Sequence, residues 1–87
     1  MHEASLMTDL IRKIIMVAHE QCATKVLGVH VTLGAWSHLS PDHLCMHFTH
    51  AIQGTIVEGA RLEIDVRPER DQTLAQEILL DRIEVEV

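Results

Sequence analysis

The spacing of apolar residues alternates between two periods along the 87-residue chain, and this alternation limits the fold more than any other feature. From Ser5 to about residue 21, apolar residues recur every three or four positions, which predicts an amphipathic helix capped by Ser5. These residues are Leu6, Met7, Leu10, Ile11, Ile14, Val17 and Ala18. Between residues 27 and 33 every second residue is apolar, which is typical of a strand with one buried face. Those residues are Leu27, Val29, Val31 and Leu33.

The remainder of the chain repeats both patterns. Ser40-Pro41-Asp42 predicts the start of a second helix, because proline in the first turn lacks only an amide that would be unpaired there. Its apolar stripe consists of Leu44, Phe48, Ala51 and Ile52, and Gly54 ends it. Alternating residues then predict two strands, over residues 61 to 67 and residues 82 to 87.

The predicted order α, β, α, β, β indicates an α+β fold, a two-layer sandwich with two helices packed on one face of a three-stranded sheet. We expect a single domain over residues 1–87, because a chain of this length has room for one hydrophobic core. Aromatic residues make up only 2% of the chain, so that core must be built from Leu, Ile and Val.

Charge and motif content exclude several functional classes. The net charge of -6 and the scattered Lys and Arg residues argue against a nucleic-acid partner. There is neither a signal-peptide pattern nor an apolar run of about 18 residues, so we expect a cytoplasmic protein that does not bind a membrane. Cys22 and Cys45 are not spaced as a CxxC pair and are expected to stay thiols. Without a nucleophile elbow or a phosphate-binding glycine loop, we do not expect an enzyme.

The first three residues, Met1-His2-Glu3, can form a chelator. A free α-amine, the amide nitrogen of His2 and its imidazole close fused rings around one ion, and planar nitrogen donors suit Ni(II) or Cu(II). Glu3 adds either its backbone nitrogen or its carboxylate, and a blocked amine would abolish the site. A histidine at position 2 is also common at ordinary frayed chain ends, so these residues alone leave both interpretations open.

Histidines on the second predicted helix form another candidate site. His43, His47 and His50 follow one another at four and three residues and therefore share a helix face, and His38 precedes that helix. They are interpreted as solvated residues, as a second or transfer site for nickel, or as a site that scavenges zinc or copper.

Other polar residues are given no site of their own. His19 and His30 are predicted to stand alone. The acidic residues Glu63, Asp65, Glu84 and Glu86 are interpreted as the solvated face of two strands, which alternatively receives a partner or a second copy.

Several stretches, taken in order along the chain, carry a family resemblance. They are Met1-His2-Glu3-Ala4-Ser5-Leu6, residues 29–37, Ser40-Pro41-Asp42-His43-Leu44 with Phe48, Gly54-Thr55, residues 58–64 and Ile83-Glu84-Val85-Glu86-Val87. Together they resemble the HypA/HybF family of hydrogenase nickel-incorporation proteins. The resemblance implies Ni(II) bound at Met1, His2 and Glu3. It also implies work with a HypB-like GTPase to load nickel into the hydrogenase large subunit, and sometimes into urease.

One segment departs from that family. The family carries a zinc lobe, with two CxxC pairs, between its last two strands, whereas residues 69–78 here contain no cysteine. We therefore expect the zinc lobe to be absent between residues 68 and 79, with no structural zinc and with its partner contacts in doubt. The shortened connection allows the last strand to pair directly or to be exchanged in a homodimer. A nickel metallochaperone is the leading hypothesis, and a metal-free interaction module or regulator with the same fold is the alternative.

Overall fold

The computed structural model describes residues 2–34, 40–66 and 78–87, with side chains described from residue 6 onward. Its elements follow the predicted order of helix, strand, helix, strand, strand. They are α1 (His2–Glu20), β1 (Lys25–Leu33), α2 (Pro41–Ala51), β2 (Arg61–Val66) and β3 (Ile78–Glu86). None of the helices in these ranges is long and apolar enough to cross a lipid bilayer.

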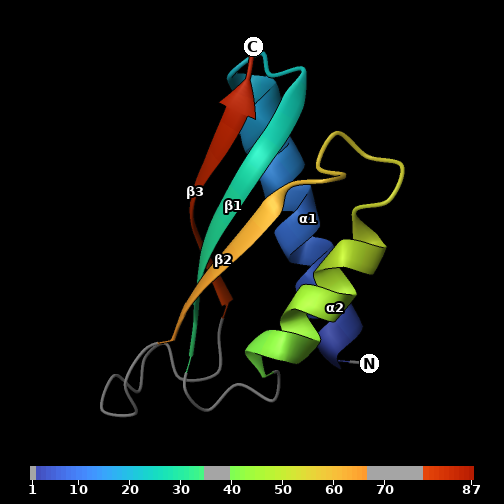
Figure 1. Ribbon diagram of the computed structural model, residues 1–87, viewed down its shortest axis with the longest axis vertical. Coiled ribbons are helices and arrows are strands. Elements are labelled where there is room, and N and C mark those ends of the chain that lie inside the picture. The colour runs from blue at the N-terminus through green and yellow to red at the C-terminus, as the bar shows by residue number, and fades with distance from the viewer. Residues whose placement is uncertain (1, 35–39, 67–77) are drawn as a thin grey trace.

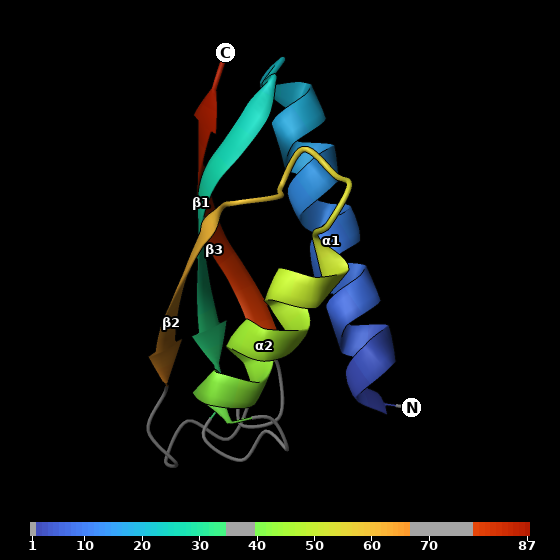
Figure 2. The ribbon, with the colours of Figure 1, turned by 45° about the vertical axis from the view of Figure 1, so that its right-hand side comes forward.

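The three strands form one mixed sheet in the order β2-β1-β3. β1 pairs with β2 in parallel and with β3 in antiparallel orientation. A parallel pair needs a crossover connection, and α2 lies in the segment that joins β1 to β2. Both helices cover the same face of the sheet (Figures 1 and 2). The predicted α+β sandwich, with two helices on one side of three strands, is confirmed.

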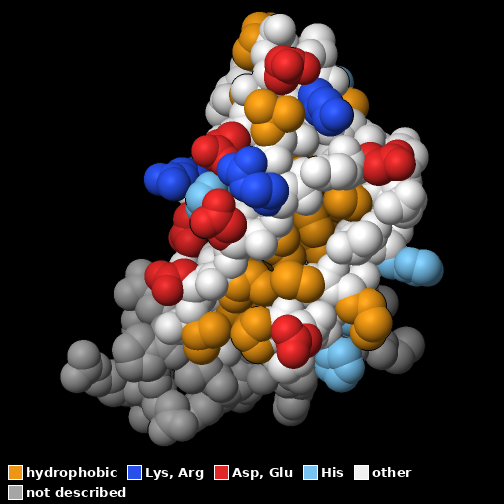
Figure 3. Space-filling model, viewed as in Figure 1, with side chains coloured by type: hydrophobic (Ala, Val, Ile, Leu, Met, Phe, Trp, Pro, Cys, Tyr) orange, Lys and Arg blue, Asp and Glu red, His pale blue; other side chains and the backbone are white. Residues whose placement is uncertain are grey.

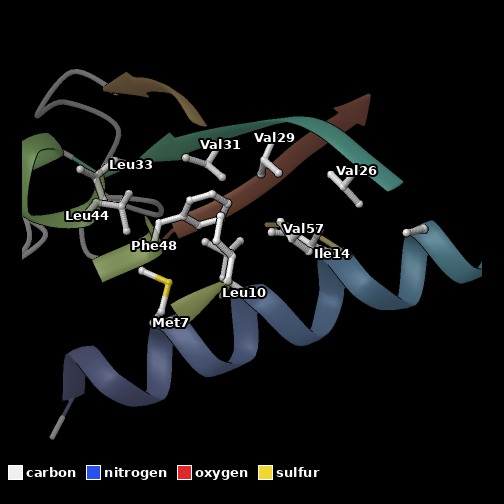
Figure 4. Close-up of a cluster of buried hydrophobic side chains, with 12 residues drawn as sticks. Met7, Leu10, Ile14, Val26, Val29, Val31, Leu33, Leu44, Phe48 and Val57 are labelled. Atoms are coloured by element: carbon white, nitrogen blue, oxygen red, sulfur yellow. The ribbon is translucent and has the colours of Figure 1, made fainter. Parts of the chain in front are cut away.

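The core fills the space between the helices and the covered face of the sheet (Figure 4). α1, β1 and α2 all contribute side chains to it, and Phe48 is its one aromatic member within residues 6–34, 40–66 and 78–87. Its fully buried side chains of largest volume are Phe48, Ile14, Leu33, Leu44, Val26, Val29, Val31 and Val57. The sequence-based expectation of an aliphatic core is therefore confirmed.

The two helix starts differ in how well local signals predict them. Ser40 caps α2 as expected, and its Oγ accepts a hydrogen bond of 3.2 Å from the His43 amide. The prediction that Ser5 caps α1 is wrong, because α1 already begins at His2. Glu3 and Ala4 are good helix formers, and the negative charge of Glu3 suits the positive end of the helix dipole.

The pairing of β1 with β3 contains two register shifts, and the first of them changes the face of the sheet on which Leu27 lies. Leu27, expected in the core, is 39% exposed, whereas its neighbour Val26 is fully buried. The shift between Val26 and Gly28 interrupts the alternation, as a β-bulge does. The other shift lies between His30 and Val31, opposite Arg82 and Leu80.

The last strand and the second helix also depart from expectation at single positions. β3 begins at Ile78, earlier than predicted, because the register shift hides the apolar alternation in its first half. Ala51, expected in the core stripe of α2, is exposed. Val87 is exposed as well and lies beyond the end of β3.

Candidate metal centre

The predicted nickel ligands lie at the start of α1. Met1 falls outside the described residues, while His2 and Glu3 form the first residues of the helix. The first four amides of an α-helix have no acceptor within the helix, so the backbone N–H groups of His2 and Glu3 are not needed by its hydrogen-bond ladder. This end of α1 lies beside α2 in both ribbon views (Figures 1 and 2).

A groove runs between the two helices. Its volume is about 640 Å³, and both helices line it. The lining residues are Met7, Thr8, Ile11, Arg12, Ile15, His47, His50 and Ala51. Ala51, which is exposed, lines this groove. Along α1 its lining combines the apolar Met7, Ile11 and Ile15 with Thr8 and Arg12, and on α2 it carries two of the predicted histidines.

The histidines of α2 share an exposed face, as their spacing predicted. His43, His47 and His50 are all exposed, and the rings of His43 and His47 meet edge to face with centroids 6.2 Å apart. The three do not form a triad in which all ligand atoms lie within 4.8 Å of one another. His38 lies outside the described residues. In this arrangement His43 and His47 are the two histidine rings of α2 that meet each other.

A different cluster of potential metal ligands lies on the uncovered face of the sheet, and the sequence analysis did not predict it. His30 on β1, Glu63 on β2 and Glu84 on β3 bring their ligand atoms within 4.8 Å of one another. His30 Nε2 lies 3.7 Å from Glu63 Oε2 and 3.6 Å from Glu84 Oε1. The prediction that His30 stands alone is wrong. Histidine, acidic and basic side chains gather over the strands on this side of the molecule (Figure 3).

Strand pairing explains why these three residues meet. In the parallel pair, His30 is the register partner of Glu63. In the antiparallel pair, Gly28 is the partner of Glu84, so the glutamate crosses the backbone of β1 beside His30. A Cβ at Gly28 would lie only 2.5 Å from Glu84 Oε1. A glycine inside a predicted strand often marks such a close approach, and Gly28 was the one sequence signal of this cluster.

Arg61 supplies positive charge to the same cluster. Its Nη2 donates to Glu84 Oε1, and its Nε lies 3.8 Å from Glu63 Oε2. The Arg61 side chain is 59% exposed, so solvent weakens these ion pairs. The uncovered face of the sheet therefore carries a histidine and two carboxylates, held by one arginine that can turn toward solvent.

Similarity to known proteins identifies the family. The family described as "Hydrogenase/urease nickel incorporation, metallochaperone, hypA" matches residues 1–72, a span that includes the amino-terminal tripeptide and both helices. The chain belongs to the HypA family. The resemblance found from the sequence is thus confirmed.

Individual HypA proteins support the same assignment. The hydrogenase maturation factor HypA of Archaeoglobus fulgidus is 41% identical over 66 residues, which cover 76% of this chain and 60% of that protein. HypA of Rhizobium leguminosarum is 37% identical over 65 residues, with 75% and 58% covered. This chain spans about three fifths of the length of these curated relatives.

A solved HypA structure has the same fold. The solution structure of the Ni metallochaperone HypA from Helicobacter pylori superposes with a TM-score of 0.77 at 18% sequence identity. The superposition covers 94% of this chain and 95% of that one. The family match ends at residue 72, so Glu84 of the sheet cluster lies beyond the matched residues. The segment between residues 68 and 79, where the zinc lobe is predicted to be absent, lies almost entirely outside the described residues.

Proposed function

We propose that this chain is a cytoplasmic nickel metallochaperone that binds Ni(II) through Met1, His2 and Glu3 and delivers it during hydrogenase maturation. The observation that carries the proposal is the HypA family match, which begins at residue 1 and therefore includes this tripeptide. The protein acts as a carrier and not as an enzyme. Its partners, a HypB-like GTPase and the hydrogenase large subunit, are those that the family resemblance implies.

Ni(II) is held in this proposal by the α-amine, the His2 amide and imidazole nitrogens, and either the nitrogen or the carboxylate of Glu3. The start of α1 at His2 supports it, because the first helical amides can lose their protons to the metal without breaking a helical hydrogen bond. Each deprotonated amide cancels one charge of Ni(II). That cancellation offsets the repulsion between a cation and the positive end of the helix dipole.

The histidines of α2 are assigned a secondary role in transfer. His47 lines the groove between the helices together with Met7, which follows His2 by about 7.5 Å of helical rise. An imidazole on the wall of this groove would replace one ligand of the amino-terminal site as the ion leaves. His43 and His50 extend the same face, and His38 precedes it.

The test is a nickel titration of the full chain with a free amino terminus, followed by calorimetry and absorption. We expect one equivalent of Ni(II) in a yellow, diamagnetic, planar complex, and His2→Ala is expected to abolish it. Affinity should rise with pH as the amine, amide and imidazole release protons. His19→Ala is the control, because His19 is exposed in the last turn of α1. Nickel binding by His2→Ala as tight as that of the parent chain would refute the amino-terminal site.

The apolar groove favours the alternative, a metal-free module that regulates hydrogenase maturation by docking another protein. A groove of about 640 Å³ lined by Met7, Ile11, Ile15 and Ala51 is a binding surface that needs no metal. If the unmodified chain fails to bind nickel at micromolar concentration, this alternative replaces the carrier.

A further inference from the structure

We propose that the uncovered face of the sheet holds a second metal site, formed by His30, Glu63 and Glu84, for a divalent cation of the zinc class. The amino-terminal nickel site plays no part in it, so a result that contradicts one proposal leaves the other unaffected. The sequence-based expectation of no structural zinc considered only cysteine ligands. Histidine and carboxylate oxygens are also zinc ligands, and here they come from three neighbouring strands.

The ligand spacing fits a tetrahedral ion. With bonds of about 2.1 Å to nitrogen and oxygen, two ligands of a tetrahedral zinc lie about 3.4 Å apart, against about 3.0 Å for an octahedral ion. His30 Nε2 lies 3.6 Å and 3.7 Å from the two carboxylate oxygens. These separations exceed the usual 2.7–3.2 Å of an N–H···O hydrogen bond and lie close to the ligand separation of a tetrahedral ion, and the two carboxylate oxygens lie within 4.8 Å of each other.

His30 Nε2 also lacks any other partner. The atom exposes less than 1 Å² to solvent and has no hydrogen bond to any described residue. The whole side chain is 17% exposed. In the neutral imidazole, an Nε2 lone pair in this position faces two negative oxygens, and a buried polar atom without a partner costs free energy. A bound cation satisfies this nitrogen and both carboxylates at once.

The sheet holds these ligands in place before the ion arrives. Each ligand is anchored in a paired strand, and sites built on strands are more precise than sites built on loops. Gly28 leaves the space that the Glu84 carboxylate occupies. A hollow of about 380 Å³ borders His30 and Glu63, next to Asp65 and Asp81. It gives water room to fill the fourth position of the ion.

The Arg61 guanidinium supplies positive charge to the same carboxylates that a bound cation would contact. Its guanidinium contacts the Glu84 carboxylate and approaches that of Glu63, so it competes with a metal for the same oxygens. Because the side chain is largely exposed, it can turn away when an ion binds. The proposal therefore predicts opposite effects for two neighbouring changes, loss of binding when a ligand is removed and gain when Arg61 is neutralised.

The experiment is a zinc titration against a chromophoric chelator. The parent is the full chain carrying His2→Ala, His43→Gln, His47→Gln and His50→Gln, so that neither the amino-terminal site nor the α2 histidines contribute. We expect one bound zinc, a higher Tm with zinc, and a shift of the His30 imidazole nitrogens in NMR spectra. Glu63→Gln and Glu84→Gln should each weaken binding at least about tenfold. Glu86→Gln, on the same strand but outside the cluster, should leave it unchanged.

Two further variants test the geometry without removing a ligand. A methyl group at Gly28 would meet the flexible end of Glu84 and also the Arg61 guanidinium. Gly28→Ala is therefore added to Arg61→Gln, where it should weaken zinc binding relative to Arg61→Gln alone by displacing Glu84, and the chain should still fold. Arg61→Gln should bind zinc more tightly than the parent. The proposal is overturned if Glu84→Gln binds zinc as tightly as the parent, or if adding Gly28→Ala to Arg61→Gln leaves the zinc affinity unchanged. It is overturned equally if one equivalent of zinc leaves the His30 signals unmoved.

Discussion

The two faces of the sheet differ in what holds them together. On the face covered by the helices, Val29 and Val31 of β1 are almost completely buried among aliphatic side chains. On the opposite face, His30 and Thr32 of the same strand contact charged side chains from both neighbouring strands. The covered face thus stabilises the protein through apolar burial, whereas the uncovered face carries polar and charged side chains that pair across the strands. Substitutions on the two faces should therefore affect different measurements.

The largest effect is expected on the covered face, from Phe48→Ala. Phe48 is 1% exposed and is the only aromatic side chain of the core among the described residues. Its truncation should lower the free energy of unfolding by about 3–5 kcal/mol, measured by urea denaturation. Met46→Ala on the same helix is the control, because Met46 is 61% exposed. Equal losses for the two variants would mean that burial of Phe48 does not stabilise the covered face.

The register shift in β1 predicts a smaller but sharper difference between adjacent residues. Val26→Thr places a hydroxyl in the core and should cost about 1–3 kcal/mol. Leu27→Thr, one residue later but on an exposed position, should change the free energy of unfolding by less than about 0.5 kcal/mol. Thermal unfolding of both variants measures the difference. The reverse order would mean that the register between Val26 and Gly28 is wrong.

On the uncovered face, Thr32→Val should cost about 1 kcal/mol. The Thr32 hydroxyl is buried and donates a 2.6 Å hydrogen bond to Asp81 Oδ2 on β3. Valine keeps the shape but loses this bond, and the partly exposed carboxylate regains water. Urea denaturation of Thr32→Val and of Asp81→Asn should give losses that overlap when the changes are combined. Fully additive losses would show that the two residues do not interact.

The smallest effect on stability is expected for Arg61→Gln, at less than about 0.5 kcal/mol, because exposed ion pairs contribute little. The same variant is expected to raise the zinc affinity. It therefore distinguishes an effect on metal binding from an effect on stability most clearly. Parallel chemical denaturation and zinc titration measure both quantities. A large loss of stability would mean that the arginine, and not an ion, organises the uncovered face.

Local sequence signals were sufficient for several features that depend on neighbouring residues, although not for the start of α1. The Ser40 cap, the burial of Leu44 and Phe48, and the partial burial of Leu62 and Ile64 in β2 follow from such signals, whereas Val66, expected on the same apolar face, is 50% exposed. The two register shifts were not predictable, because they depend on how β1 and β3 fit together across the sheet. They place Leu27 at the surface and interrupt the apolar alternation in the first half of β3, so the sequence did not predict that half of the strand.

The same distinction applies to the candidate sites. The Met1-His2-Glu3 chelator is contiguous, so the residues and their resemblance to the HypA family were enough to propose it. The His30 cluster depends on which residues of β2 and β3 lie opposite β1. Its members are remote in sequence, and no pattern within any one strand relates them. Gly28 hinted at a close approach, but only strand pairing identifies Glu84 as the side chain above it.

The position of β1 between the other two strands has a consequence for hydrogen–deuterium exchange. Its amides donate to neighbours on both sides, whereas β2 and β3 each pair along one edge within the described sheet. Amide protons of β1 should therefore exchange only when the whole domain opens, while those at the outer edges exchange through local fraying. His30 lies in this central strand, so its backbone should be the last of the three ligand-bearing segments to lose its hydrogen bonds when the edges of the sheet fray.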